Sequence, residues 1–128
     1  MKAFKVIFFV FFLSLFVSSC VNDEPLAKVK YEISGLDNLV AEIKYTGALG
    51  GTETVTDISK FAGGKDFKTI GVNFLPFESK LKISVNNFSP NSKNYTLTIY
   101  VDGVAKTSTI INAAASSLTT GELNYTVD

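Results

Sequence analysis

The single cysteine of this 128-residue chain, Cys20, is the residue whose surroundings most clearly indicate chemistry. Two lysines in the first five residues precede an apolar run from Val6 to Val17, and two serines stand directly before the cysteine. A basic start, a short apolar core and small residues before a cleavage site are typical of a secretory signal peptide. The apolar run is also shorter than the roughly 20 residues that a membrane-spanning helix needs. We therefore expect residues 1–19 to be a signal peptide that is removed.

The segment Val17-Ser18-Ser19-Cys20 resembles the lipobox of bacterial lipoproteins. The resemblance implies that the Cys20 thiol receives a diacylglyceryl group, that cleavage leaves Cys20 as the first residue, and that its amine is acylated as well. The chain would then be an outer-membrane lipoprotein, held by palmitate-type chains and facing either the periplasm or the cell surface. On this interpretation residues 20–26 are the lipidated cysteine and its tether, and residues 27–128 are the folded domain.

Two acidic residues, Asp23 and Glu24, lie in this tether. One interpretation is a solvated linker that keeps the domain away from the lipid. The other is a sorting signal, because acidic residues just after the lipidated cysteine resemble the surface-export signal of Bacteroidetes lipoproteins. The sequence leaves both interpretations open.

The composition excludes several classes of function. The chain has no histidine and no arginine, and its twelve lysines balance twelve carboxylates. Without clustered basic residues there is no counterion-release drive toward nucleic acid. Without histidine, and with its one thiol assigned to lipid, the chain lacks the commonest general base, metal ligand and nucleophile. The carboxylates are scattered, so no pair is placed for acid–base catalysis. We expect a non-enzymatic protein without a metal or cofactor.

Beyond Ala27 apolar and polar residues alternate with a period of two, which predicts half-buried strands. The clearest alternation is Leu81, Ile83 and Val85 with lysine and serine between them. We expect seven or eight strands, near residues 27–33, 41–46, 52–58, 67–74, 80–85, 95–101, 104–111 and 123–127. With turn signals every 8–12 residues and no convincing helix, the pattern predicts an all-β, antiparallel β-sandwich of immunoglobulin-like architecture. A cysteine–tryptophan–cysteine core is missing, so the prediction concerns the architecture alone.

Turn chemistry separates the predicted strands. Asp102-Gly103 is a pair favoured in type I′ hairpins, because both positions need a positive φ. Pro76 should end the strand before it, since proline donates no ladder hydrogen bond. Residues 86–94 are predicted to form a long polar loop. Residues 113–117 could form a helical turn or a loop of small residues, and we expect the loop.

Four segments in order resemble small extracytoplasmic lipoproteins of the MmpS-like, transport-accessory type of Bacteroidetes. They are Tyr31-Glu32-Ile33-Ser34-Gly35, Ala41-Glu42-Ile43-Lys44-Tyr45-Thr46, Gly50-Gly51-Thr52-Glu53 and Ile99-Tyr100-Val101-Asp102-Gly103. The chain departs from that pattern in its centre, where it inserts residues 67–77 and an asparagine-rich loop. The resemblance implies an envelope-exposed accessory domain and brings no catalytic residues.

Aromatic residues near predicted loops or on an outward face are the candidate partner-binding residues: Phe74, Phe77, Phe88 and Tyr100. They either plug the ends of the sandwich over the core or form an apolar patch that meets a partner. We therefore expect a lipid-anchored binding or transport-accessory module, bound to the membrane by its anchor and to another envelope protein by its domain. A surface adhesin or structural subunit is the alternative.

Overall fold

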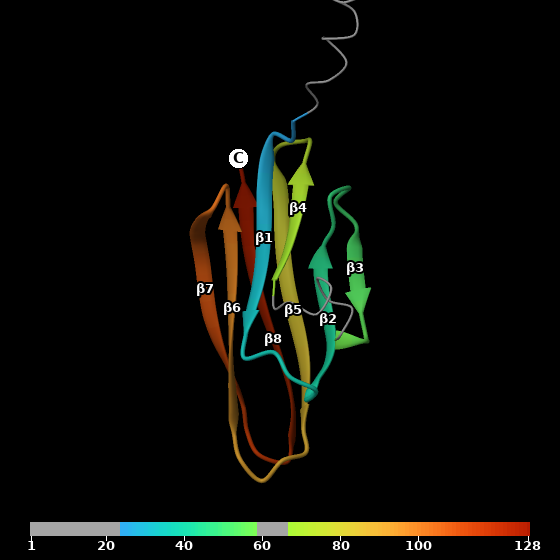
Figure 1. Ribbon diagram of the computed structural model, residues 1–128, viewed down its shortest axis with the longest axis vertical. Coiled ribbons are helices and arrows are strands. Elements are labelled where there is room, and N and C mark those ends of the chain that lie inside the picture. The colour runs from blue at the N-terminus through green and yellow to red at the C-terminus, as the bar shows by residue number, and fades with distance from the viewer. Residues whose placement is uncertain (1–23, 59–66) are drawn as a thin grey trace, which may run out of the picture.

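The computed structural model describes residues 24–58 and 67–128, and every regular element in these ranges is a strand (Figure 1). The strands are β1 (Ala27–Ser34), β2 (Val40–Thr46), β3 (Thr52–Val55), β4 (Phe67–Val72), β5 (Phe77–Asn87), β6 (Lys93–Val101), β7 (Val104–Ala113) and β8 (Ser117–Val127).

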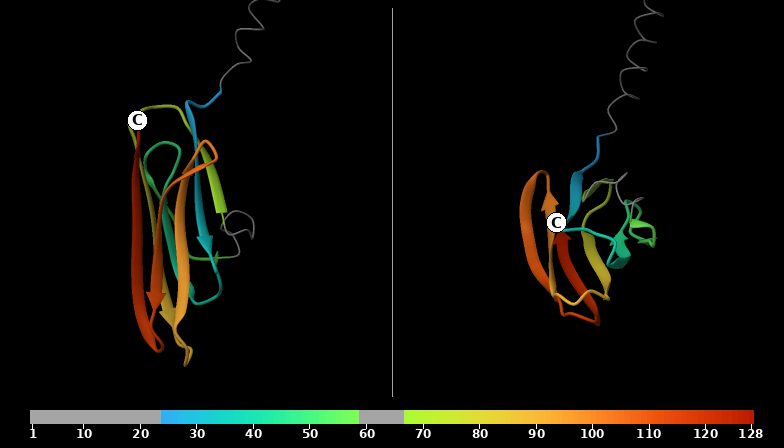
Figure 2. Two further views of the ribbon diagram at one scale, coloured as in Figure 1. Left: turned by 90° about the vertical axis from the view of Figure 1, so that its left-hand side faces the viewer. Right: turned by 60° about the horizontal axis from the view of Figure 1, so that its bottom comes forward.

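The eight strands form two antiparallel sheets of four strands that pack face to face (Figures 1 and 2). Sheet A has the order β4-β1-β6-β7, and sheet B has the order β3-β2-β5-β8. The predicted all-β sandwich is therefore confirmed. In a constant-type immunoglobulin domain the first two strands are neighbours in one sheet. Here β1 and β2 lie in different sheets, so the likeness is one of architecture and not of strand order.

The core lies between the sheets because alternate residues of each central strand point inward. β1 contributes Val29, Tyr31 and Ile33, and β5 contributes alternate residues from Phe77 to Asn87. The intervening residues are mainly lysine, glutamate, serine and asparagine, and they lie on the outer faces. Each Å² of apolar surface that these inward residues remove from water stabilises the fold by about 25 cal/mol.

Tyr31 connects the two sheets through the core. Its side chain is fully buried and its ring contacts the Tyr45 ring at 5.5 Å. Its hydroxyl donates to the Thr46 carbonyl oxygen at 2.8 Å and accepts a hydrogen bond from the Lys80 backbone N–H. The pairing of β2 with β5 ends at Tyr45 and Leu81, so the Tyr31 hydroxyl hydrogen-bonds to backbone groups just beyond the last paired residues. Burial raises the pKa of this hydroxyl, which keeps it protonated and able to donate.

Several element boundaries differ from the sequence-based prediction. The predicted polar loop over residues 86–94 is shorter, because β5 continues through Asn87 and β6 already begins at Lys93. β8 begins at Ser117, so the small residues before it form a tight turn in which Ser116 has a φ of 54°. The loop expected there is thus confirmed. The type I′ hairpin is also confirmed, with φ values of 50° at Asp102 and 81° at Gly103.

The chain enters and leaves the sandwich at the same end (Figure 1). The described chain begins beside the end of β4, and β8 finishes at Val127 beside the start of β5. We call this the tether end, and it also carries the β2–β3, β4–β5 and β6–β7 turns. The opposite, distal end carries the β1–β2, β5–β6 and β7–β8 connections.

The two sheets come close together at Gly121 of β8. A Cβ atom built on this glycine would overlap the side chain of Ile111, which comes from β7 in the other sheet. The absence of a side chain at position 121 thus lets Ile111 fill the gap between the sheet edges. Gly51, in the β2–β3 turn, has no atom within 4 Å of such a Cβ and provides a comparison.

We expect Gly121→Ala to lower the free energy of unfolding by about 1–3 kcal/mol, because the added methyl overpacks this seam. Gly51→Ala should change it by less than about 1 kcal/mol, since the added methyl meets open space. Chemical denaturation of the two variants beside the unsubstituted protein measures both values. Equal midpoints for the two alanine variants would contradict the close contact at the seam.

Candidate functional site

The predicted lipidation and export residues lie at the start of the chain. Cys20 and Asp23 fall outside the described residues, and Glu24 is exposed where the description begins. The next two residues are already attached to sheet A. Pro25 packs on Gly71 of β4, and the Leu26 N–H donates to the Val72 carbonyl oxygen at 2.8 Å. The described chain is therefore attached to sheet A from Pro25 onward, two residues before β1 begins.

Phe77 is not a partner-binding residue, because its side chain is completely buried in the core. Its ring packs edge-on against Phe74, with ring centroids 5.5 Å apart. Phe74 lies in the β4–β5 turn, half exposed, with its ring tip beside Gly50. These two aromatics therefore close the tether end of the core, and the partner-patch interpretation is wrong for Phe77.

Tyr100 points outward from sheet A, as its place between the buried Ile99 and Val101 predicts. The ammonium of Lys30 lies 4.2 Å from the Tyr100 ring centroid and 5.3 Å from that of Phe67. The Tyr100 hydroxyl donates to Glu32 Oε1 at 3.2 Å. Desolvation, and then the hydrogen bond to Glu32, raise the pKa of Tyr100. This residue is engaged in a cation–π cluster on the outer face of the sheet, where solvent limits its contribution to stability.

Phe88 lies at the distal end and is 70% exposed. The four predicted aromatics thus lie in three places: Phe74 and Phe77 at the tether end, Tyr100 on the outer face of sheet A, and Phe88 at the distal end. They do not form one patch. Leu118, the second residue of β8, is 80% exposed and also lies at the distal end.

Asn87 fixes two of the distal connections; it is buried at the end of β5, although the sequence predicted it within the polar loop over residues 86–94. Its side-chain Nδ2 donates to the carbonyl oxygens of Asn91 at 2.9 Å, Ala113 at 3.0 Å and Ala114 at 3.2 Å. Its Oδ1 accepts from the Ser89 N–H at 3.0 Å. One amide therefore links the β5–β6 loop to the end of β7. The signal that could have located it is the inward parity that Asn87 shares with the alternate residues of β5 before it.

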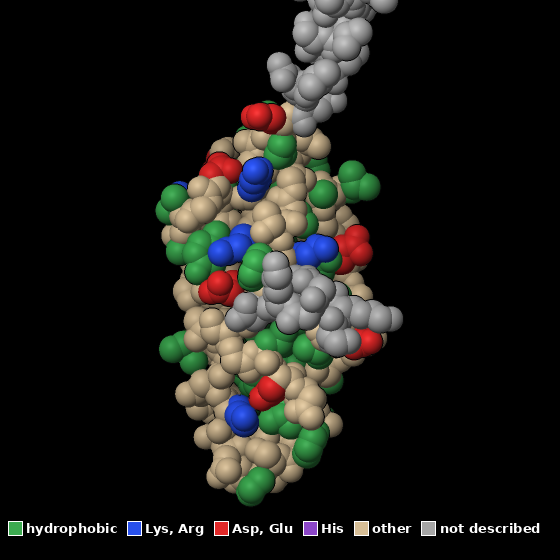
Figure 3. All heavy atoms as spheres, in the orientation of Figure 1, with side chains coloured by type: hydrophobic (Ala, Val, Ile, Leu, Met, Phe, Trp, Pro, Cys, Tyr) green, Lys and Arg blue, Asp and Glu red, His purple; other side chains and the backbone are tan. Residues whose placement is uncertain are grey.

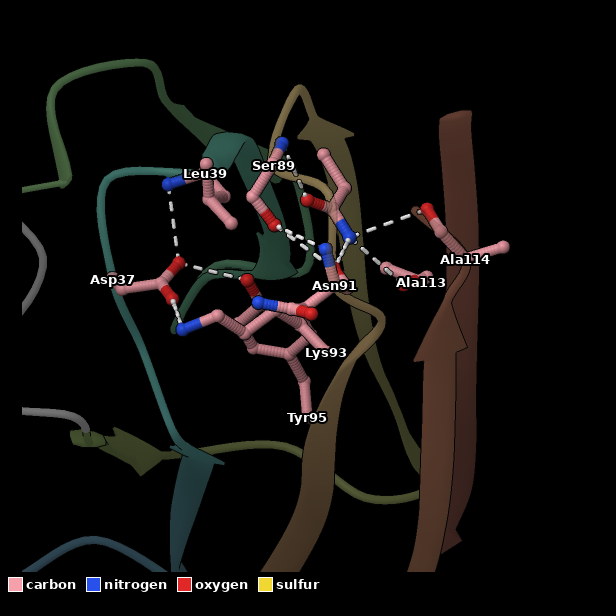
Figure 4. A network of polar contacts seen from close by, with 9 residues as sticks. Asp37, Leu39, Ser89, Asn91, Lys93, Tyr95, Ala113 and Ala114 are labelled. Carbon is pink, nitrogen blue, oxygen red and sulfur yellow. Dashed lines mark hydrogen bonds and ion pairs between the residues drawn. The ribbon is translucent and has the colours of Figure 1, made fainter. Parts of the chain in front are cut away.

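A second polar group, the Asp37 carboxylate, holds the neighbouring β1–β2 connection (Figure 4). Asp37 Oδ1 accepts from the Leu39 N–H at 3.1 Å and from the Tyr95 hydroxyl at 2.7 Å, and its Oδ2 lies 3.4 Å from Lys93 Nζ. Burial, followed by the hydrogen bond to Asp37, raises the pKa of Tyr95. The tyrosine therefore remains a donor across the neutral range.

A shallow hollow of about 480 Å³ lies on the outer face of sheet B near the tether end. Polar side chains of β2, β3, β5 and β8 line it, and Glu78 is the one carboxylate in this lining. Among the described residues no three histidine, cysteine or acidic side chains are grouped as metal ligands. Within the same ranges there is no helix that could cross a bilayer. The strongest candidate site is the distal end, where the exposed Phe88 of the β5–β6 loop and Leu118 of β8 lie beside connections held by internal hydrogen bonds.

We expect Asn87→Ala to lower the free energy of unfolding by about 1–3 kcal/mol, because it leaves buried carbonyl groups without their donor. Asn86→Ala is the matched control. Its side chain is exposed in the same strand, and its backbone N–H keeps the bond to the Leu39 carbonyl oxygen. Equilibrium denaturation compares the two, and hydrogen exchange at Ser89 reports the loosened loop. Unchanged stability and exchange in Asn87→Ala would refute the assigned role.

No family model matches this chain, and no curated protein sequence matches it either.

Proposed function

We propose that this protein is a lipid-anchored, non-enzymatic module of the bacterial cell envelope, similar in role to transport-accessory lipoproteins. Cys20 carries the acyl chains, and the tether joins it to the sandwich. Each buried CH₂ of an acyl chain contributes about 0.8 kcal/mol, so two or more chains give stable anchoring. The observation that carries the proposal is the difference between the two ends of the domain. The described chain enters at one end, and the exposed Phe88 of the β5–β6 loop and Leu118 of β8 lie at the other.

The distal end is suited to binding because its loops are ordered before a partner arrives. The Asn87 amide links the β5–β6 loop to the end of β7, and the Asp37 carboxylate attaches the β1–β2 connection to the first residues of β6. A preorganised surface loses less conformational entropy on association than a mobile one. Phe88 and Leu118 add apolar area that a protein partner could cover. The partner class is thus another envelope protein, contacted at the end farthest from the tether.

A surface adhesin or structural subunit is the second candidate, favoured by the long edge of sheet B. β8 has eleven residues and pairs along one side only, with β5. It contains no proline and no lysine, the residues that commonly protect an edge from pairing with another chain. Protease shaving of intact cells separates the candidates. Cleavage would favour the adhesin and make Asp23-Glu24 an export signal, whereas protection until the envelope is opened would favour the periplasm-facing module.

We expect Cys20→Ala to abolish incorporation of labelled palmitate and to move the protein out of the membrane fraction. Ser19→Ala should retain both properties, because it keeps a small residue before the cysteine. The measurement is metabolic labelling followed by fractionation. Labelling of the Cys20→Ala variant at the level of the unsubstituted protein would show that the anchor lies elsewhere.

We expect a photo-crosslinking amino acid at position 88 or 118 to capture the same protein in living cells. The same group at position 49, at the tether end, should not capture it, because that position lies at the opposite end of the domain. Adducts are compared by size and identified by mass spectrometry. Capture from position 49 but not from 88 and 118 would move the partner surface away from the distal end.

A further inference from the structure

Large exposed apolar side chains gather at the tether end. Leu26 precedes β1, Leu49 lies at the tip of the β2–β3 turn, Phe74 and Leu75 form the β4–β5 turn, and Val104 begins β7. Leu49 is 94% exposed and Leu26 is 62% exposed. Within the described residues, the β2–β3 and β4–β5 turns at this end each present an apolar side chain, and Val104 follows directly after the β6–β7 turn. Figure 3 shows separate hydrophobic side chains among polar ones at the upper end of the molecule, and further hydrophobic side chains below them.

These positions are unusual for exposed apolar residues. Turns on a solvated surface favour glycine, proline, asparagine, aspartate and serine. The turn that contains Leu49 also has three glycines, which can adopt the backbone conformations that a tight turn requires. The turn conformation therefore does not require a leucine at position 49. Single exposed apolar residues are ordinary, but several on separate turns of one end indicate a surface that something covers.

The short tether identifies what covers it. Only three residues, Val21 to Asp23, separate Cys20 from Glu24, so their Cα atoms span at most about 14 Å. A longer span would require residues 24–26 to detach from the domain. Pro25 would then have to leave Gly71, and the hydrogen bond from the Leu26 N–H to the Val72 carbonyl oxygen would have to break. A lipidated Cys20 would therefore hold the tether end against the headgroup region, which is about 5–8 Å thick on each side of the bilayer.

Charge at the same end selects the kind of lipid surface. Glu24, Glu78, Asp102 and Asp128 are exposed at or near this end, together with Lys28, Lys80 and Lys106. An anionic surface attracts polybasic segments, and this end is not polybasic. Zwitterionic headgroups impose no such requirement and admit the apolar tips by burial of their area.

We propose that the tether end is a membrane-docking surface, which rests end-on on a zwitterionic phospholipid layer with its apolar turn tips at headgroup depth. This inference rests on the proposed lipidation of Cys20. It assigns a role to Leu49, Leu75 and Val104 that the anchor alone does not require. The domain would stand upright on the bilayer, with its long axis along the membrane normal.

The test uses the full-length, processed lipoprotein reconstituted in phosphatidylcholine vesicles. Leu49→Cys and Val104→Cys place an environment-sensitive fluorophore at the tether end, and Phe88→Cys and Leu118→Cys place it at the distal end. Cys20 is the only native cysteine, and acylation blocks its thiol. We expect lipids with bromine or nitroxide groups near the headgroup to quench positions 49 and 104 at least about threefold more than positions 88 and 118.

Mass spectrometry of Cys20 and vesicle flotation separate the docking surface from the anchor. An acylated protein that floats but shows no greater quenching at the tether-end positions overturns the docking surface and leaves the anchor intact. A protein without acyl chains overturns both. Leu49→Glu combined with Val104→Glu should reduce quenching of a probe at position 75, whereas Phe88→Glu combined with Leu118→Glu should not. Stronger quenching in anionic vesicles than in phosphatidylcholine would overturn the choice of lipid.

Discussion

The hydrogen bonds of the Tyr31 hydroxyl are the interactions on which the tether end of the fold depends. Tyr31 belongs to sheet A, yet its hydroxyl joins backbone groups of two strands of sheet B at the point where those strands separate. A backbone donor or acceptor buried without a partner would cost about 1–3 kcal/mol. The tyrosine allows β2 to turn away toward β3 while β5 continues, and this divergence makes room for the hollow and for the turn that carries Leu49.

Polar side chains perform the same task at the distal end. Asn87 and Asp37 satisfy backbone groups of connections that no strand pairing reaches. In the described residues every buried side-chain nitrogen and oxygen has a partner. A domain of about 100 residues without disulfides has a modest stability margin, so unpaired buried groups would be costly. Internal hydrogen bonds therefore hold the connections at both ends of the sandwich without a disulfide.

The sequence predicted the sandwich well because strand alternation is a local property. It predicted the outward direction of Tyr100 for the same reason. It misplaced Phe77 and Asn87, which share the inward parity of Leu81, because the predicted strand covered only residues 80–85 and β5 extends beyond it at both ends. The contacts of Asp37 with Tyr95 and of Gly121 with Ile111 join residues far apart in the chain. No local pattern encodes such pairs, and so the candidate surfaces became visible only in three dimensions.

The common position of both chain ends has a practical consequence for anyone who would use this domain as a display scaffold. A cargo fused after Asp128 would emerge at the end of the sandwich where the described chain begins, beside Glu24 and the start of β1. A peptide inserted in the turn between Ala113 and Ser117 would emerge at the far end instead. Because Asn87 donates hydrogen bonds to the carbonyl oxygens of Ala113 and Ala114, the insertion should follow Ala115, where it leaves both hydrogen bonds in place.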